Sequence, residues 1–95
     1  MAVYQAIFKL SFFKDLKKLP KSCRLQVETV IDRLVEDPFA TPHVKKLLGY
    51  NGLYRYRIGD YRLVYYVQPS PKKIVFLVVA HRKDVYRSLK RSEHH

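Results

Sequence analysis

Three arginines, Arg55, Arg57 and Arg62, have spacings that would gather their guanidinium groups into a binding site for an anion. Successive side chains of a strand point to opposite faces, so Arg55 and Arg57 share one face if residues 53–58 form a strand. Gly59-Asp60 favours a two-residue type II′ hairpin turn, whose register places Arg62 opposite Arg57. Like charges in opposite positions weaken a sheet by about 0.2–1 kcal/mol, so folding alone does not select this pairing.

A phosphodiester is a suitable ligand for such a cluster, because guanidinium groups bind phosphate and stabilise the extra negative charge of its transition state. RNA also supplies its own nucleophile, the 2′-hydroxyl group, so cleavage requires orientation, charge stabilisation and proton transfer. The alternative is a solvated sheet face whose guanidinium groups spread into water. Arginine, with a pKa above about 12, acts as a clamp rather than a base, so the sequence leaves the general base unassigned.

Three residues near the C-terminus extend the candidate site. Residues 74–80 form an apolar run without alternation, which is typical of a strand buried on both faces. If this strand runs antiparallel to residues 61–67, Arg82 at its end lies near the hairpin turn and joins the arginines. Tyr86, about one helical turn further on, reaches the same groove, and His81 could exchange a proton. The structural alternatives are a tyrosine that docks a terminal helix and a satisfied histidine at a strand end.

The charge of the chain favours a nucleic acid as its partner. Nineteen Lys and Arg residues against eight Asp and Glu residues give a net charge of +11, although a folded acidic protein could also neutralise it. Lys45 and Lys46 are expected to strengthen attraction to phosphate, and Tyr66 to stack on unpaired bases. Solvated lysines are the alternative for the first two.

Metal, cofactor, disulfide and membrane are not expected. Cys23 is the single cysteine, and no cationic segment followed by an apolar signal core opens the sequence, so a cytoplasmic location is expected. No segment has the length and apolarity of a spanning helix. His43 is isolated and His81 lacks a second ligand at metal-site spacing, so no metal site is predicted.

The elements that must position these residues form one small α+β domain, since 95 residues are enough for a single core. Residues 3–8 predict a first strand, and Ser11 is the expected N-cap of a short helix. A second helix follows Pro20 and ends at Asp37-Pro38, and a loop is expected over residues 38–51.

The expected order is β-α-α-β-β-β with a short C-terminal helix that begins within residues 84–89. The two N-terminal helices pack on one face of a small, mainly antiparallel sheet, and the face with the arginines stays open as a shallow basic groove. Residues 1–91 are expected to form the domain. Residues 92–95 are expected to form a disordered tail, of the kind that a purification tag leaves.

The chain resembles the RelE/ParE toxin superfamily and, within it, the RelE-like mRNA endonucleases that act on the ribosome. The resemblance rests on motifs that occur together and in order. They are residues 14–20 (KDLKKLP), 34–38 (LVEDP), 46–49 (KLLG), 53–65 (LYRYRIGDYRLVY) and 81–86 (HRKDVY).

This resemblance implies a fold akin to small microbial ribonucleases and the role of a toxin in a type II toxin-antitoxin system. It implies metal-independent cleavage of mRNA in the ribosomal A site by 2′-hydroxyl attack, which inhibits translation. It also implies a RelB-like antitoxin that wraps the toxin in a hetero-oligomer. The family's catalytic positions fall on Arg55, Arg57, Arg62, Arg82 and Tyr86, and His81 matches a position that is histidine in some branches.

Two other functions fit the same sequence. The ParE-like branch of the superfamily inhibits DNA gyrase without cutting RNA and shares the fold, but it generally lacks the full set of basic residues and tyrosine. A non-catalytic, basic RNA-binding module is the second alternative. The first two catalytic positions are often lysine in the family, and the arginines found here cannot readily act as the base.

Overall fold

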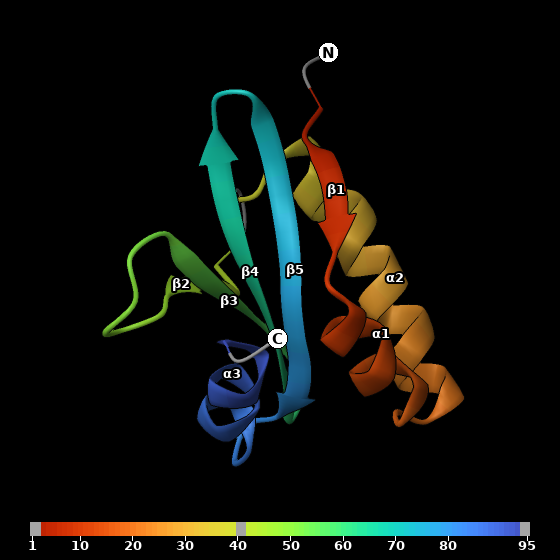
Figure 1. The fold of residues 1–95 in the computed structure, drawn as a ribbon. Helices are drawn as coiled ribbons and strands as arrows, with labels where there is room; N and C mark the ends of the chain where they lie inside the picture. The colour runs from red at the N-terminus through yellow and green to blue at the C-terminus, as the bar shows by residue number, and fades with distance from the viewer. Residues whose placement is uncertain (1–2, 40–41, 94–95) are drawn as a thin grey trace.

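A computed structural model describes residues 3–39 and 42–93, and over these residues the chain forms three helices and one five-stranded sheet (Figure 1). The fold is α+β, as the sequence predicts. The elements in chain order are β1 (Gln5–Phe8), α1 (Leu10–Lys17), α2 (Lys21–Glu36), β2 (Val44–Lys46), β3 (Leu53–Ile58), β4 (Tyr61–Pro69), β5 (Lys72–His81) and α3 (Val85–Glu93).

The sheet has the strand order β1-β5-β4-β3-β2, and only the β1–β5 pair is parallel among the described strands. The prediction that the apolar run of residues 74–80 forms an interior strand is confirmed, because β5 lies between β1 and β4. The register of the β3–β4 hairpin is also as predicted, with Arg57 opposite Arg62. Gly59 has φ +58° and Asp60 does not have a positive φ, which fits a type II′ turn.

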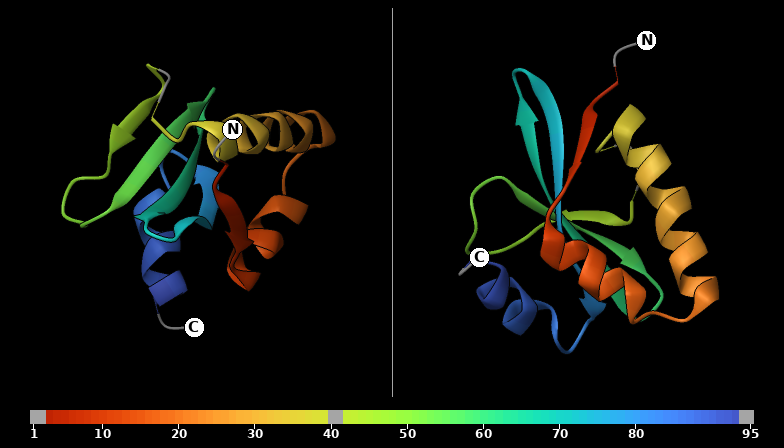
Figure 2. Two further views of the ribbon diagram at one scale, coloured as in Figure 1. Left: turned by 90° about the horizontal axis from the view of Figure 1, so that it is seen from above. Right: turned by 45° about the vertical axis from the view of Figure 1, so that its right-hand side comes forward.

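Helices α1 and α2 cover one face of the sheet and form the main core with it (Figure 2). Their apolar residues recur every three or four positions, so one side of each helix can be buried. The innermost side chains are Phe12 on α1, Val27 and Leu34 on α2, and Tyr65 and Phe76 on the sheet.

The opposite face is less open than the sequence predicts. Helix α3 buries Val85 and Leu89 against Val64 of β4 and Val78 of β5, which form a second, smaller core with Leu47. Side chains alternate along β3 and β4, so Val64 lies on the same face as its partner Arg55. The basic surface is therefore confined to the part of this face over β2, β3 and the first residues of β4.

Two local predictions are wrong. The N-cap of α1 is Lys9, and the Ser11 hydroxyl instead donates a hydrogen bond of 3.3 Å to the carbonyl of Leu77 on β5. Residues 44–46, expected within a loop, form the edge strand β2 and pair with β3. Both differences arise from contacts with distant strands, which local sequence signals do not contain.

Helix α3 extends to Glu93, so residues 92 and 93 lie in a helix rather than in the expected tail, and residues 94 and 95 lie outside the described residues. No helix in the described part of the chain is long and apolar enough to cross a membrane.

Candidate functional site

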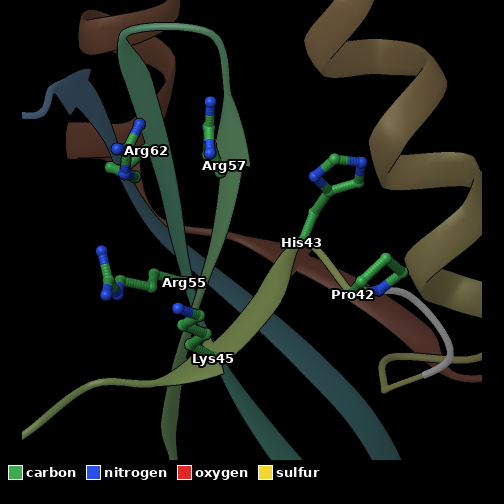
Figure 3. A pocket seen from close by; sticks show the side chains of 6 residues that line it. All are labelled: Pro42, His43, Lys45, Arg55, Arg57 and Arg62. Atoms are coloured by element: carbon green, nitrogen blue, oxygen red, sulfur yellow. The ribbon is translucent and has the colours of Figure 1, made fainter.

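A pocket of about 250 Å³ lies over β2, β3 and the start of β4 (Figure 3). Four cationic side chains and one imidazole line it, and no carboxylate is among the lining residues that the structure describes. The residues that line the pocket are Pro42, His43, Lys45, Arg55, Arg57 and Arg62. The charge of this lining suits an anion, and the fork of a guanidinium group matches the geometry of phosphate oxygens.

The pairing of three strands places these cations. Lys45 of β2 lies opposite Arg55 of β3, and Arg57 lies opposite Arg62 of β4. The Arg62 guanidinium folds back over the hairpin turn, where Nη1 donates hydrogen bonds to the carbonyls of Gly59 at 2.9 Å and Tyr61 at 3.0 Å. Backbone carbonyls thus orient one cation of the pocket, while the exposed Arg57 stays available to a ligand.

The cations destabilise one another electrostatically. Burial lowers the pKa of the Arg62 guanidinium below its ordinary value, and three positive charges lower it further, those of Arg55, Arg57 and Arg82. The carboxylate of Asp60 partly opposes them. An anion bound among these guanidinium groups would relieve the repulsion, so the ligand-free cluster is preorganised for negative charge.

Arg82 joins the cluster from the far end of the chain, as the sequence predicts. Its backbone N–H donates a hydrogen bond of 2.8 Å to the carbonyl of Asp60, so the end of β5 lies beside the hairpin turn. Its charge is close enough to lower the pKa of Arg62. The positive charge around the hairpin turn therefore comes from the hairpin and from the segment that follows β5, although Arg82 is not among the residues that line the pocket.

The structure does not bring His81 or Tyr86 into the pocket. His81 pairs with Tyr61 in the β4–β5 register, and their rings lie 5.8 Å apart on the face that α1 and α2 cover. There His81 lines a separate hollow with Asp15 of α1. Tyr86 lies in the first turn of α3 with its side chain 51% exposed. Their catalytic roles stay predictions.

The three residues predicted to bind RNA take different positions. Lys45 lines the pocket, whereas Lys46 pairs with Tyr54 and its side chain lies on the opposite face of the sheet. Tyr66 lies on the arginine face, further along β4, opposite Leu53 and against Gly52. Lys45 can therefore contact a ligand in the pocket, whereas Lys46 points away from it, and the RNA-binding roles of these residues stay predictions.

His43 is the pocket residue that sequence reasoning missed. Taken alone it is an isolated histidine, because its nearness to the arginines depends on the pairing of β2 with β3. The signal that could have revealed it is a strand over residues 44–46, but three residues are too few to show an alternating pattern.

Fold and pocket together define a small basic α+β protein with a cationic pocket on one face of its sheet. The family described as "ParE toxin of type II toxin-antitoxin system, parDE" matches residues 6–86. Toxin RelE3 of Methanocaldococcus jannaschii is 31% identical over 85 residues, which cover 86% of this chain and 94% of that protein. The chain therefore belongs to the RelE/ParE family of type II toxins, which confirms the resemblance that its motifs carry.

Solved structures agree with this assignment. RelE in the archaeal RelE-RelB complex from Pyrococcus horikoshii OT3 is 32% identical with a TM-score of 0.74, and the match covers 86% of this chain and 97% of that one. An arginine-to-alanine double mutant of E. coli toxin RelE in the free state is 26% identical with a TM-score of 0.75, covering 94% and 97% of the two chains.

Proposed function

We propose that this toxin is a ribosome-dependent, metal-independent endoribonuclease that cleaves mRNA in the A site and thereby stops translation. One observation carries the proposal, namely a pocket of about 250 Å³ whose described lining residues include four cations and no carboxylate. A two-metal or paired-carboxylate hydrolase needs acidic ligands at its centre, whereas transesterification by the substrate's own 2′-hydroxyl group needs cations and a proton acceptor.

The positions of the residues assign them different roles in catalysis and RNA binding. Arg62, whose guanidinium group is bonded to the hairpin turn, and Arg82, whose backbone N–H is bonded to the same turn, hold the scissile phosphate. Arg55 and Arg57 stabilise the charge that develops in the transition state and bind the flanking mRNA. Tyr86 assists proton transfer or orients the nucleotide. Lys45 adds a phosphate contact, and Tyr66 stacks on a base.

The partner that restrains this toxin is proposed to be a RelB-like antitoxin, in a hetero-oligomer in the cytoplasm. Relatives from Methanococcus jannaschii, Pyrococcus horikoshii OT3 and E. coli were crystallised as RelB-RelE complexes. The net charge of +11 favours an acidic partner that covers the basic face.

Primer extension on a message under translation tests the proposed activity. New 5′ ends at A-site codons are expected with the toxin and not with its Arg62→Ala variant. EDTA added below the magnesium concentration removes tighter-binding transition metals while ribosomes stay assembled, and it should leave the cutting intact. Absence of new ends on translated message, or undiminished cutting by Arg62→Ala, would refute the proposal.

Inhibition of DNA gyrase is the second candidate, because the matching family is described by parDE. A gyrase inhibitor of this kind would produce trapped double-strand breaks in a supercoiling assay and would leave mRNA intact. RNA binding with a steep salt dependence, but without arrest of either process, would instead identify a non-catalytic module.

A further inference from the structure

We propose that His43 is the general base of this site and takes the proton from the attacking 2′-hydroxyl group. This inference rests on the proposed endoribonuclease function, whose residues otherwise leave the proton without an acceptor. It begins from the position of the imidazole, which lines the same pocket as Arg55, Arg57 and Arg62 (Figure 3).

Backbone and ring contacts fix His43 at this wall. Its carbonyl accepts a hydrogen bond of 3.2 Å from the N–H of Arg57, which extends the β2–β3 ladder by one position. Its ring lies 5.5 Å from that of Tyr56, a side chain only 4% exposed and therefore anchored in the core. A base must be held within reach of the hydroxyl group, and these contacts hold the imidazole beside the phosphate-binding guanidinium groups.

The chemistry of the lining residues singles out the same side chain. Among the described residues that line the pocket, the others with ionisable side chains are lysine and arginine, which remain protonated at neutral pH. An imidazole ordinarily titrates between about pH 5 and 8, so it can accept a proton and return it to water within one turnover. Proton transfer by such a group contributes about 10²–10⁴-fold to a rate.

A second hollow supplies room for the nucleoside that carries the attacking hydroxyl group. A groove of about 390 Å³ runs between α2 and β3 and shares His43 and Arg57 with the arginine pocket. Its walls include Leu25 of α2 and Tyr56, which offer apolar surface to a base. The imidazole thus stands between a space for the scissile phosphate and a space for the nucleoside on its 5′ side.

The step balances without a cofactor. The 2′-oxygen of the upstream nucleotide attacks the phosphorus while His43 accepts the hydroxyl proton. The P–O5′ bond breaks, and the leaving 5′-oxygen takes a proton from water. The products are a 2′,3′-cyclic phosphate and a 5′-hydroxyl end, and the imidazolium returns its proton to solvent. Arg62 and Arg82 neutralise the pentacoordinate phosphorane during the transfer.

The other charged side chains that line the two hollows, in the described part of the chain, are lysines and arginines, so a pH dependence of cleavage near neutrality would not come from them. Lysine and arginine side chains ordinarily keep their charge through the range of about pH 5–8. The charged side chains that line these hollows together with His43, among the described residues, are Lys45 on β2, Arg55 and Arg57 on β3, Arg62 on β4 and Arg33 on α2.

Single-turnover cleavage on programmed ribosomes tests the role of His43 as the base. The proteins compared are wild type, His43→Ala, His43→Gln and, as a surface control, Lys14→Ala on the exposed side of α1. We expect both His43 variants to lose about 10²–10⁴-fold in rate with A-site occupancy unchanged. Added imidazole should restore the rate of His43→Ala by at least about tenfold, and the pH dependence of the wild-type rate should be lost in His43→Gln.

Three results would overturn the role of His43 as the base. The first is a variant rate within about threefold of wild type, and the second is a loss that imidazole does not rescue in a variant that unfolds at the wild-type temperature. The third is a pH dependence that persists in His43→Gln. A substrate with sulfur as the bridging 5′ leaving atom should leave the His43→Ala defect in place, and full recovery would show an acid rather than a base. If the wild type itself does not cleave, the proposed function fails, and this role with it.

Discussion

The backbone N–H of Arg82 donates a hydrogen bond of 2.8 Å to the carbonyl of Asp60, which ties the end of β5 to the turn of the β3–β4 hairpin. Arg62 is anchored at the same turn through the carbonyls of Gly59 and Tyr61. The turn therefore holds the Arg62 guanidinium group directly and the backbone of Arg82 beside it, although the two residues are distant in the sequence. Preorganisation of this kind lets cations stabilise a phosphoryl transition state without reorganising during the reaction.

The Arg62→Ala variant should separate activity from stability. Its side chain makes hydrogen bonds only at the surface turn and repels Arg57, so we expect the free energy of unfolding to change by less than about 1 kcal/mol. Cleavage should fall by at least about 100-fold, because a preorganised charge is lost. Urea denaturation and single-turnover cleavage measure the two effects, and a large loss of stability would contradict the surface role.

Lys45 and Lys46 provide a matched pair on opposite faces of β2. We expect Lys45→Ala to weaken RNA binding and to reduce the slope of log affinity against log salt by about 1, because a direct phosphate contact is lost. Lys46→Ala should change the slope less, since its side chain lies away from the pocket. Titrations of a labelled RNA at several salt concentrations measure both slopes, and equal effects would place the RNA elsewhere.

Alanine substitutions at Gly52 and Gly49 provide a test and its matched control. Both have a positive φ, +77° and +84°, so an alanine at either position is strained by about 1–2 kcal/mol. A Cβ at Gly52 would also lie 2.7 Å from the Tyr66 ring, whereas the space at Gly49 is open. We expect Gly52→Ala to displace the Tyr66 ring and weaken RNA binding, and Gly49→Ala to affect stability alone. Tyr66 fluorescence in a variant stripped of other exposed tyrosines would report the shift.

Asp15 should make stability depend on pH. Burial raises the pKa of its carboxyl above the ordinary 3.8, although the hydrogen bond from the Val79 N–H and the charges of Lys18 and Arg91 oppose the effect. Because the pKa is higher in the folded than in the unfolded state, protonation of Asp15 stabilises the fold. This contribution to the free energy of unfolding is fully present at low pH and is lost as the pH rises through the folded-state pKa.

Asp15→Asn should therefore unfold at higher urea concentration than wild type at neutral pH, because it stays uncharged and keeps an oxygen that can accept the 3.4 Å hydrogen bond from Val79. The two proteins should converge below about pH 4, where the wild-type carboxyl is protonated in both states. Asp15→Ala, which lacks the acceptor, should be less stable than Asp15→Asn by about 1 kcal/mol. A wild type more stable than Asp15→Asn at neutral pH would refute the argument.

Tyr65→Phe should lower stability and leave the chemistry intact. The buried Tyr65 hydroxyl donates a hydrogen bond of 2.8 Å to the carbonyl of Pro38, and burial raises the pKa of this phenol. Removal of the donor leaves that carbonyl without its partner, at a cost of about 1–3 kcal/mol. Urea denaturation measures the loss, and cleavage well below the unfolding temperature should stay within about threefold of wild type.

The sequence by itself determined the arginine hairpin and the family. Alternation along residues 53–66 and the two-residue turn at Gly59-Asp60 fix which side chains share a face, because a shift of one residue would turn the core-facing side chains of the shifted strand away from the core. The buried apolar run likewise identified β5 as an interior strand, and Arg82 at its end followed from the antiparallel pairing.

Only the tertiary structure decided which other groups meet the arginines. His43 enters the pocket through a three-residue edge strand that is too short to have a sequence pattern, while the register of β4 with β5 turns His81 toward α1 and α2. The docking of α3 through Val85 and Leu89 restricts the basic face to its β2–β3 side. Local periodicity specifies faces and turns, but the partners of an edge strand or a terminal helix are set by apolar surface that distant segments leave uncovered.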